Sequence, residues 1–172
     1  MITHSNTLRS YLLLLVFGLT LVGFSNKTNT ELSATTDTFD HNQFIFNVHL
    51  SGANEVPAND SEAFGRAIVR INKSETMIYY KVIVNNIMDV KASHFHMAPA
   101  GSNSGVVATL FTAGTSGWTN GLLAEGTIQA ENLQGALAGQ ELSALIDAIR
   151  AGNIYVNVHT ATHPGGEIRG QL

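Results

Sequence analysis

The sequence predicts an all-β protein, and three observations lead to that prediction. Apolar and polar residues alternate with a period of two through most of the chain from residue 43 onward. Gly, Asn and Ser residues, which favour turns, separate these short alternating segments. One stretch, residues 140–151, instead carries its apolar residues at helical spacing. Together these patterns favour about eight antiparallel strands in a two-sheet sandwich or a barrel, with one short helix.

The first 25 residues predict an export signal that stands apart from the folded domain. Arg9 precedes an uninterrupted apolar run from Tyr11 to Phe24, which is shorter than the roughly 20 residues that cross a bilayer. A cleaved signal peptide is therefore favoured for residues 1–25, and a retained anchor formed by residues 11–24 is the alternative. In either case we expect the protein to be secreted or extracytoplasmic.

Residues 26–42 predict a polar linker, and residues 43–172 a single domain. The linker is rich in Asn, Thr, Ser and Asp and has too few apolar residues to fold alone. Within the domain, strands are expected at residues 43–52, 66–72, 76–86, 91–97, 105–111, 122–130, 153–159 and 167–172.

Alternation along the strands predicts which side chains are buried. Phe44, Val82, Phe95 and Val156 should meet in one core. Trp118 lies in a glycine-rich turn region, where a lone tryptophan is expected to cover one end of the core, with an exposed recognition residue as the alternative.

Composition excludes several kinds of chemistry. The chain contains no cysteine, so it has neither disulfides nor a cysteine nucleophile. A formal net charge of −4, without a cluster of basic residues, argues against nucleic acid as a partner. Motifs for nucleotide binding or for a serine nucleophile elbow are also missing from the sequence. We therefore expect no enzyme and no organic cofactor.

Four histidines form the candidate site. His94 and His96 lie two residues apart on one expected strand, so their side chains share a face. His159 ends another strand, and His163 follows it in a turn. Neutral imidazoles bind zinc and copper, and three or four of them complete a site if the two segments are neighbours. Alternatively, the histidines are polar residues of a sheet face that hold nearby loops by hydrogen bonds.

The chain resembles the CHRD domain family, which is named for chordin. The resemblance extends from about residue 44 to the C-terminus and rests on four motifs in order: LSGANEVP, HFHMAPAG, LSALIDAIRAGNIYVNVHT and HPGGEIRGQ. It implies an immunoglobulin-like β-sandwich of Greek-key type, located outside the cytoplasm, without an established catalytic activity. The export signal, the polar linker and the lack of a catalytic constellation favour an exported, non-enzymatic binding module that contacts an extracellular protein or a surface polymer. Such a module would meet the membrane only through its N-terminal segment.

A second resemblance concerns the histidines. A strand with two histidines at this spacing, a glycine-containing loop and a late histidine are similar to the metal-binding layout of copper/zinc superoxide dismutase. The sequence departs from that enzyme because it has no disulfide cysteines and no zinc loop with a coordinating aspartate. Dismutase activity is not expected, and the alternative function is a copper- or zinc-binding protein that uses His94, His96, His159 and His163.

Overall fold

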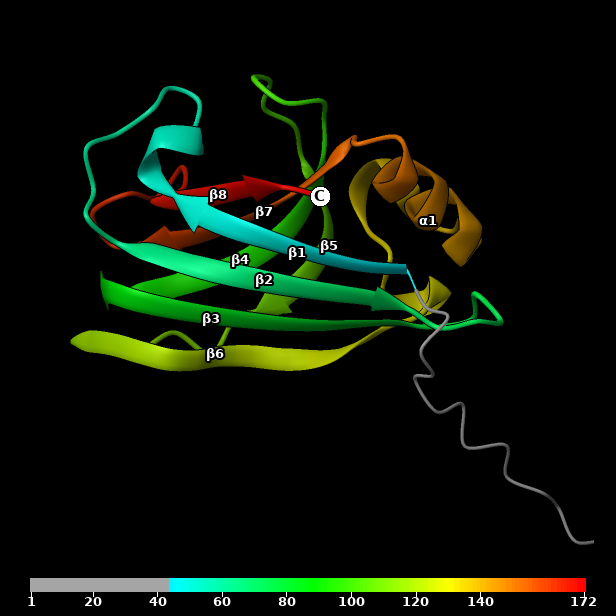
Figure 1. The fold of residues 1–172 in the computed structure, drawn as a ribbon, viewed down its shortest axis with the longest axis horizontal. Coiled ribbons are helices and arrows are strands. Elements are labelled where there is room, and N and C mark those ends of the chain that lie inside the picture. Colours follow the sequence, from blue (N-terminus) through cyan, green and yellow to red (C-terminus); the bar gives the residue numbers. More distant parts are fainter. Residues whose placement is uncertain (1–43) are drawn as a thin grey trace, which may run out of the picture. The chain divides into compact units, whose positions relative to one another are not determined.

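Eight strands and one α-helix make up the domain, which a computed structural model describes for residues 44–172 (Figure 1). The strands are β1 (Phe44–Ser51), β2 (Phe64–Ile71), β3 (Ile78–Met88), β4 (Val90–Met97), β5 (Val106–Phe111), β6 (Trp118–Ile128), β7 (Ile154–Thr160) and β8 (Ile168–Gln171). The helices are α1 (Leu142–Arg150) and the short 3-10 helices η1 (Gly52–Asn54), η2 (Ala130–Asn132) and η3 (Gly135–Leu137). The all-β prediction with one helix is confirmed, whereas the expected signal peptide (1–25) and linker (26–42) lie outside the described residues.

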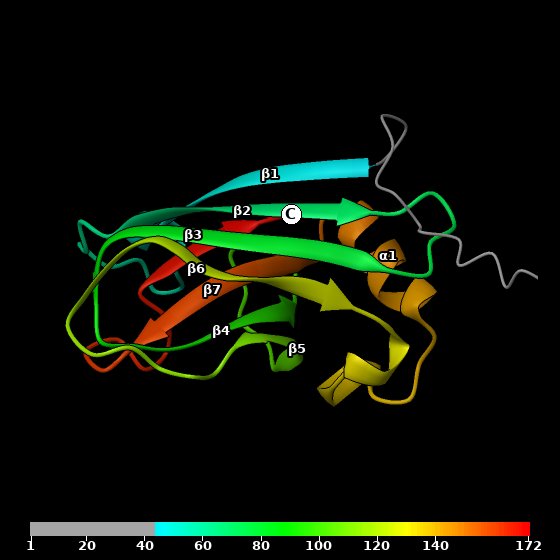
Figure 2. The ribbon, with the colours of Figure 1, turned by 90° about the horizontal axis from the view of Figure 1, so that it is seen from below.

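All eight strands belong to one antiparallel sheet in the order β5-β4-β7-β8-β1-β2-β3-β6. The sheet curls so that its edge strands β5 and β6 approach each other, which makes it nearly a barrel. Figure 2 shows β1, β2 and β3 on one side of the domain, β4 and β5 on the other, and α1 at one end.

The immunoglobulin-like arrangement of two separate sheets is not confirmed. Strand β8 pairs with β7 along four residues and also with β1, where Ser51 lies opposite Arg169. This joint makes the two halves one continuous sheet. A period of two places each side chain on a face, but it does not show which strands are neighbours.

The core lies inside the curled sheet and confirms most of the expected burial. Val82, Phe95 and Val156 are buried with almost no exposed surface. The prediction for Phe44 is wrong, because this residue begins β1 at the margin of the domain and its side chain is 55% exposed. The guanidinium carbon of Arg150 lies 4.7 Å from the centroid of the Phe44 ring.

Trp118 does not cover the end of the core. Strand β6 starts earlier than expected and includes Trp118, which lies opposite Met88 of β3. Its side chain is 65% exposed and points away from the core. The expectation of a buried plug is therefore wrong, because the extended backbone of β6 continues through the expected turn.

Helix α1 confirms the helical stretch and closes one end of the core. Its apolar residues recur at helical spacing and are buried: Leu142, Leu145, Ile146 and Ile149. Gly152 follows with a positive φ of 69°, a left-handed conformation that glycine adopts readily after a helix. None of the helices in residues 44–172 has the length and apolar character needed to cross a membrane.

Candidate metal centre

Strands β4 and β7 are neighbours, which brings the two histidine segments together. The antiparallel register places His94 opposite Asn157 and His96 opposite Tyr155. His159 lies one step further along β7, opposite Ala92 of β4. Because alternate residues share a face, these side chains lie on the opposite side of the sheet from the buried Phe95. The adjacency that a metal site requires is present.

His94, His96 and His159, hereafter the histidine cluster, form a compact group. One ring nitrogen from each histidine lies within 4.8 Å of the corresponding nitrogens of the other two. The ring centroids are 5.0 Å apart for His94 and His159, 5.6 Å for His94 and His96, and 5.9 Å for His96 and His159.

These separations suit a shared metal ion. Imidazoles that bind one zinc ion through bonds of about 2.0–2.1 Å have ring centroids about 5–5.5 Å apart and nitrogens about 3.3 Å apart. The rings of the histidine cluster therefore stand at nearly the right spacing. The largest nitrogen separation is at most 4.8 Å, so the rings would have to close by up to about 1.5 Å to bind one ion.

Two nitrogens of the histidine cluster are buried without a hydrogen-bond partner. They are Nδ1 of His94 and Nε2 of His159. Nδ1 of His159 lies 2.9 Å from the carbonyl oxygen of Pro164, which can only accept, so this nitrogen donates. In the neutral ring Nε2 of His159 then carries a free lone pair, as a metal ligand requires.

Burial keeps the histidine cluster neutral. It lowers the pKa of His94 to about 4, with smaller contributions from the neighbouring rings of His159 and His96. Burial is also the main cause of the lowered pKa of His96 and of His159. Since only the neutral imidazole binds a metal ion, the three rings are in the binding form at neutral pH.

Hydrogen bonds and stacking fix the ring of His96. Its Nδ1 lies 2.9 Å from the carbonyl oxygen of Ser104, and its plane stacks on Tyr155 with ring centroids 4.8 Å apart. The guanidinium carbon of Arg169 lies 3.4 Å from the centroid of the same tyrosine ring. Because β4 and β8 flank β7, His96 and Arg169 hold Tyr155 from its two sides.

His163 lies apart from the histidine cluster. Its Nδ1 is 3.3 Å from Oε2 of Glu167 and 3.2 Å from Oγ1 of Thr162. Its backbone N–H donates to Oγ1 of Thr160, which in turn donates to Glu167. These contacts hold the turn between β7 and β8, and they correspond to the alternative interpretation of a histidine that stabilises a loop.

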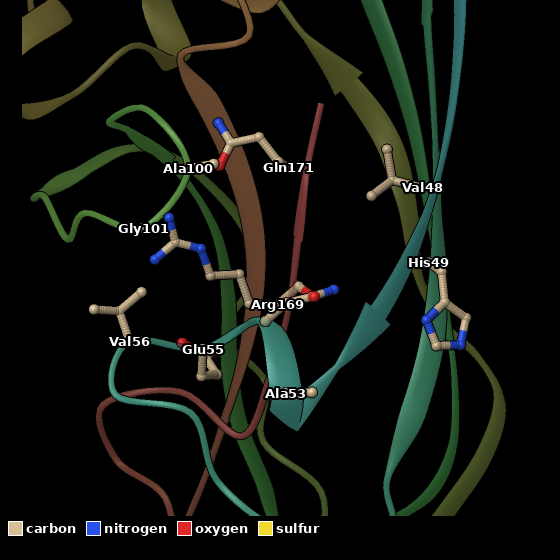
Figure 3. Close-up of a pocket in the computed structure, with 10 residues that line it drawn as sticks. Val48, His49, Ala53, Glu55, Val56, Ala100, Gly101, Arg169 and Gln171 are labelled. Carbon is tan, nitrogen blue, oxygen red and sulfur yellow. The ribbon is translucent and has the colours of Figure 1, made fainter.

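A cavity of about 520 Å³ lies beside the site, on the other side of Tyr155 from His96. Figure 3 shows Arg169 and Glu55 on its wall, together with Val48 and His49 of β1. Arg169 is only 2% exposed. Its guanidinium group donates hydrogen bonds to the carbonyl oxygen of Ser102 and to Oδ1 of Asn103, in the loop between β4 and β5.

Glu55 is the most perturbed carboxyl group beside this cavity. Burial raises its pKa to about 7, although the positive charge of Arg169 opposes the shift. Sequence analysis missed Glu55, Arg169 and Tyr155 as parts of this region. Tyr155 alternates along one strand with Asn157 and His159, so their shared face was the available signal in the sequence. Glu55 gave no such signal, because it reaches the region from a loop that precedes β7 by about 100 residues.

Comparison with known proteins gives one result. Residues 46–172 match the model of the CHRD domain. No curated protein and no solved structure matches the chain. The family match covers nearly all of the described domain and includes every residue of the histidine cluster.

Proposed function

The chain belongs to the CHRD domain family, and we propose that this member binds one zinc or copper ion outside the cytoplasm through His94, His96 and His159. The observation that carries the proposal is the convergence of three neutral imidazoles, two of which present buried nitrogens without a hydrogen-bond partner. His163 is not part of the proposed ligand set.

The unpartnered nitrogens favour metal binding over a purely structural role. A buried polar atom without a hydrogen bond costs about 1–3 kcal/mol. A structural role would account for His163, which has partners in its turn. It leaves Nδ1 of His94 and Nε2 of His159 without a partner, whereas one bound ion would supply a partner to both.

Isothermal titration calorimetry on the chain without a histidine tag tests the proposal. We expect Zn²⁺ and Cu²⁺ to bind one ion per chain, and His94→Ala and His159→Ala each to weaken binding at least about 100-fold. Loss of an outer partner of a ligand already costs about 10–100-fold, so loss of a ligand should cost more. His49→Ala is the matched control, because His49 is exposed on β1.

Either of two results would overturn the proposed metal site. One is a wild-type chain that binds neither ion in a 1:1 ratio. The other is an equal loss of binding in His49→Ala and His94→Ala, which would indicate nonspecific binding to surface histidines.

Export is the second part of the proposal. It is supported by the apolar run from Tyr11 to Phe24, which follows Arg9 and precedes a polar segment. N-terminal sequencing of the protein from its native cells should give a mature chain that begins near residue 26. A chain that retains residues 1–25 and fractionates with membranes would indicate the anchor, and a full-length cytoplasmic chain would contradict export.

A binding module for an extracellular protein or a surface polymer is a second candidate function. It is favoured by large apolar side chains exposed on one face of β2, β3 and β6: Phe64, Met88, Trp118 and Leu122. Exposed apolar groups gathered on one face often mark interaction sites. Labelled protein should bind to intact cells of the source organism, and the variant Trp118→Ser/Leu122→Ser should bind less. Equal binding by the variant would contradict this role.

A further inference from the structure

Asn157 lies next to the histidine cluster, and its position suggests a role as a metal ligand. It is 2% exposed, faces the same side of β7 as His159, and lies opposite His94 in the register of β4. Its Oδ1 atom is 3.0 Å from Nε2 of His96. The nature of that contact depends on which nitrogen of His96 carries the proton.

The proton of His96 is fixed by Ser104. Nδ1 of His96 lies 2.9 Å from the carbonyl oxygen of Ser104, and a carbonyl oxygen only accepts hydrogen bonds. Nδ1 therefore carries the hydrogen and donates it. In the neutral ring, Nε2 then has no hydrogen and presents a lone pair toward Asn157.

The contact between His96 and Asn157 thus joins two atoms that both carry lone pairs. Two acceptors 3.0 Å apart in a buried site repel each other unless a cation lies beside both. Reversal of the Asn157 amide would present an N–H to His96 and turn the amide oxygen toward Glu55, because the present Nδ2 and Oε1 of Glu55 both lie close to one point beside Gly166. In that orientation Asn157 would hold His96 by a hydrogen bond, so the orientation with Oδ1 toward Nε2 is the one in which residue 157 can be a ligand.

The distance itself matches that of two ligands on one metal ion. With metal–ligand bonds of about 2.0–2.2 Å and angles between 90° and 109°, two ligand atoms stand about 2.9–3.5 Å apart. The 3.0 Å separation of Nε2 and Oδ1 lies within that range. The present distance between these two atoms therefore fits two ligands of the same ion.

We infer that the Oδ1 atom of Asn157 is the fourth ligand of the metal ion bound by the histidine cluster, an inference that rests on the proposed function. Three imidazole nitrogens and one amide oxygen form a ligand set suited to Zn²⁺ or Cu²⁺. The proposed ligand set contains no thiolate or thioether, and the sequence has no cysteine. It should therefore favour divalent zinc or copper over monovalent copper.

Asn157→Leu tests the inference, because leucine is similar in size and removes the oxygen. We expect this variant to bind Zn²⁺ at least about tenfold more weakly in calorimetry and to change the electron paramagnetic resonance spectrum of bound Cu²⁺. Asn157→Asp keeps an oxygen ligand and adds a negative charge, so it should bind Zn²⁺ as tightly as the wild type or more tightly. The control Asn47→Leu, at an exposed position of β1, should change neither measurement.

The outcomes separate this inference from the proposed function. If the wild type binds no metal, the proposed function fails. If the wild type binds and requires His94, while Asn157→Leu keeps the same affinity and the same Cu²⁺ spectrum, only the role of Asn157 is overturned. If Asn157→Leu does not fold, Asn157→Asp decides: a Cu²⁺ spectrum identical to that of the wild type would contradict ligation by residue 157.

Discussion

Replacement of Glu55 by glutamine should change the pH dependence of stability in a calculable way. Glu55 is 7% exposed, its Oε1 has no hydrogen-bond partner, and burial raises its pKa from 4.5 to about 7. The folded chain therefore holds this proton more tightly than the unfolded chain. The stability contributed by the protonated group is complete below pH 4.5 and is lost as the pH rises through about 7.

The magnitude follows from the two pKa values. One pKa unit corresponds to about 1.4 kcal/mol, so the difference between 4.5 and about 7 amounts to about 3 kcal/mol of unfolding free energy. Glutamine keeps the size of the side chain and does not titrate. The unfolding free energy of the wild type minus that of Glu55→Gln should therefore fall by about 3 kcal/mol between pH 4.5 and pH 8.

Urea unfolding of both proteins across this pH range, with a chelator present, measures the difference directly. The contributions of the histidine cluster are common to both proteins and cancel. Glu62→Gln is the matched control for the loss of a carboxyl group, because Glu62 is exposed on the same loop. A Glu55→Gln difference that varies by less than about 0.5 kcal/mol would show that the buried carboxyl group is not protonated in the fold.

Three further predictions follow from burial and packing. Because burial lowers the pKa of all three members of the histidine cluster, zinc affinity measured by calorimetry should fall less than about tenfold between pH 7.5 and pH 6; a fall of about fiftyfold, expected for three histidines of ordinary pKa, would contradict this. Gly170→Ala should lower the unfolding free energy by at least about 2 kcal/mol, because a Cβ there would overlap Val48 and the backbone of His49. At Gly105 a Cβ would meet open space, so Gly105→Ala should change the unfolding free energy by less than about 0.5 kcal/mol. Trp118→Ser should likewise have little effect on the unfolding free energy, because the side chain is exposed. Thermal and urea unfolding measure all three variants. Equal destabilisation by both glycine variants, or a large loss of stability in Trp118→Ser, would refute the described packing.

The sequence predicts the local features of the fold well, because they depend on the period of the chain. Alternation places His94 and His96 on one face and Phe95 on the other, and the structure agrees. The helical spacing of residues 140–151 and the glycine after it similarly predict α1 and its end. Each of these features is decided by residues within a few positions of one another.

The features that sequence analysis missed depend on contacts between distant segments. The pairing of β4 with β7 joins residues about 60 positions apart, and the joint of β1 with β8 joins Ser51 to Arg169. Neither pairing leaves a signal in the spacing of one sequence. The burial of Glu55 likewise depends on a loop that folds against the turn at Gly166. The candidate ligands could thus be named from the sequence, but their convergence could not.

Crystallographic anomalous scattering at the zinc absorption edge tests the central claim most directly. In crystals of the zinc-loaded protein, we predict one strong peak at about 2.0–2.1 Å from a ring nitrogen of each member of the histidine cluster. A chain with that cluster intact and no peak among its rings, or with the peak beside His163 and Glu167 instead, would contradict the account.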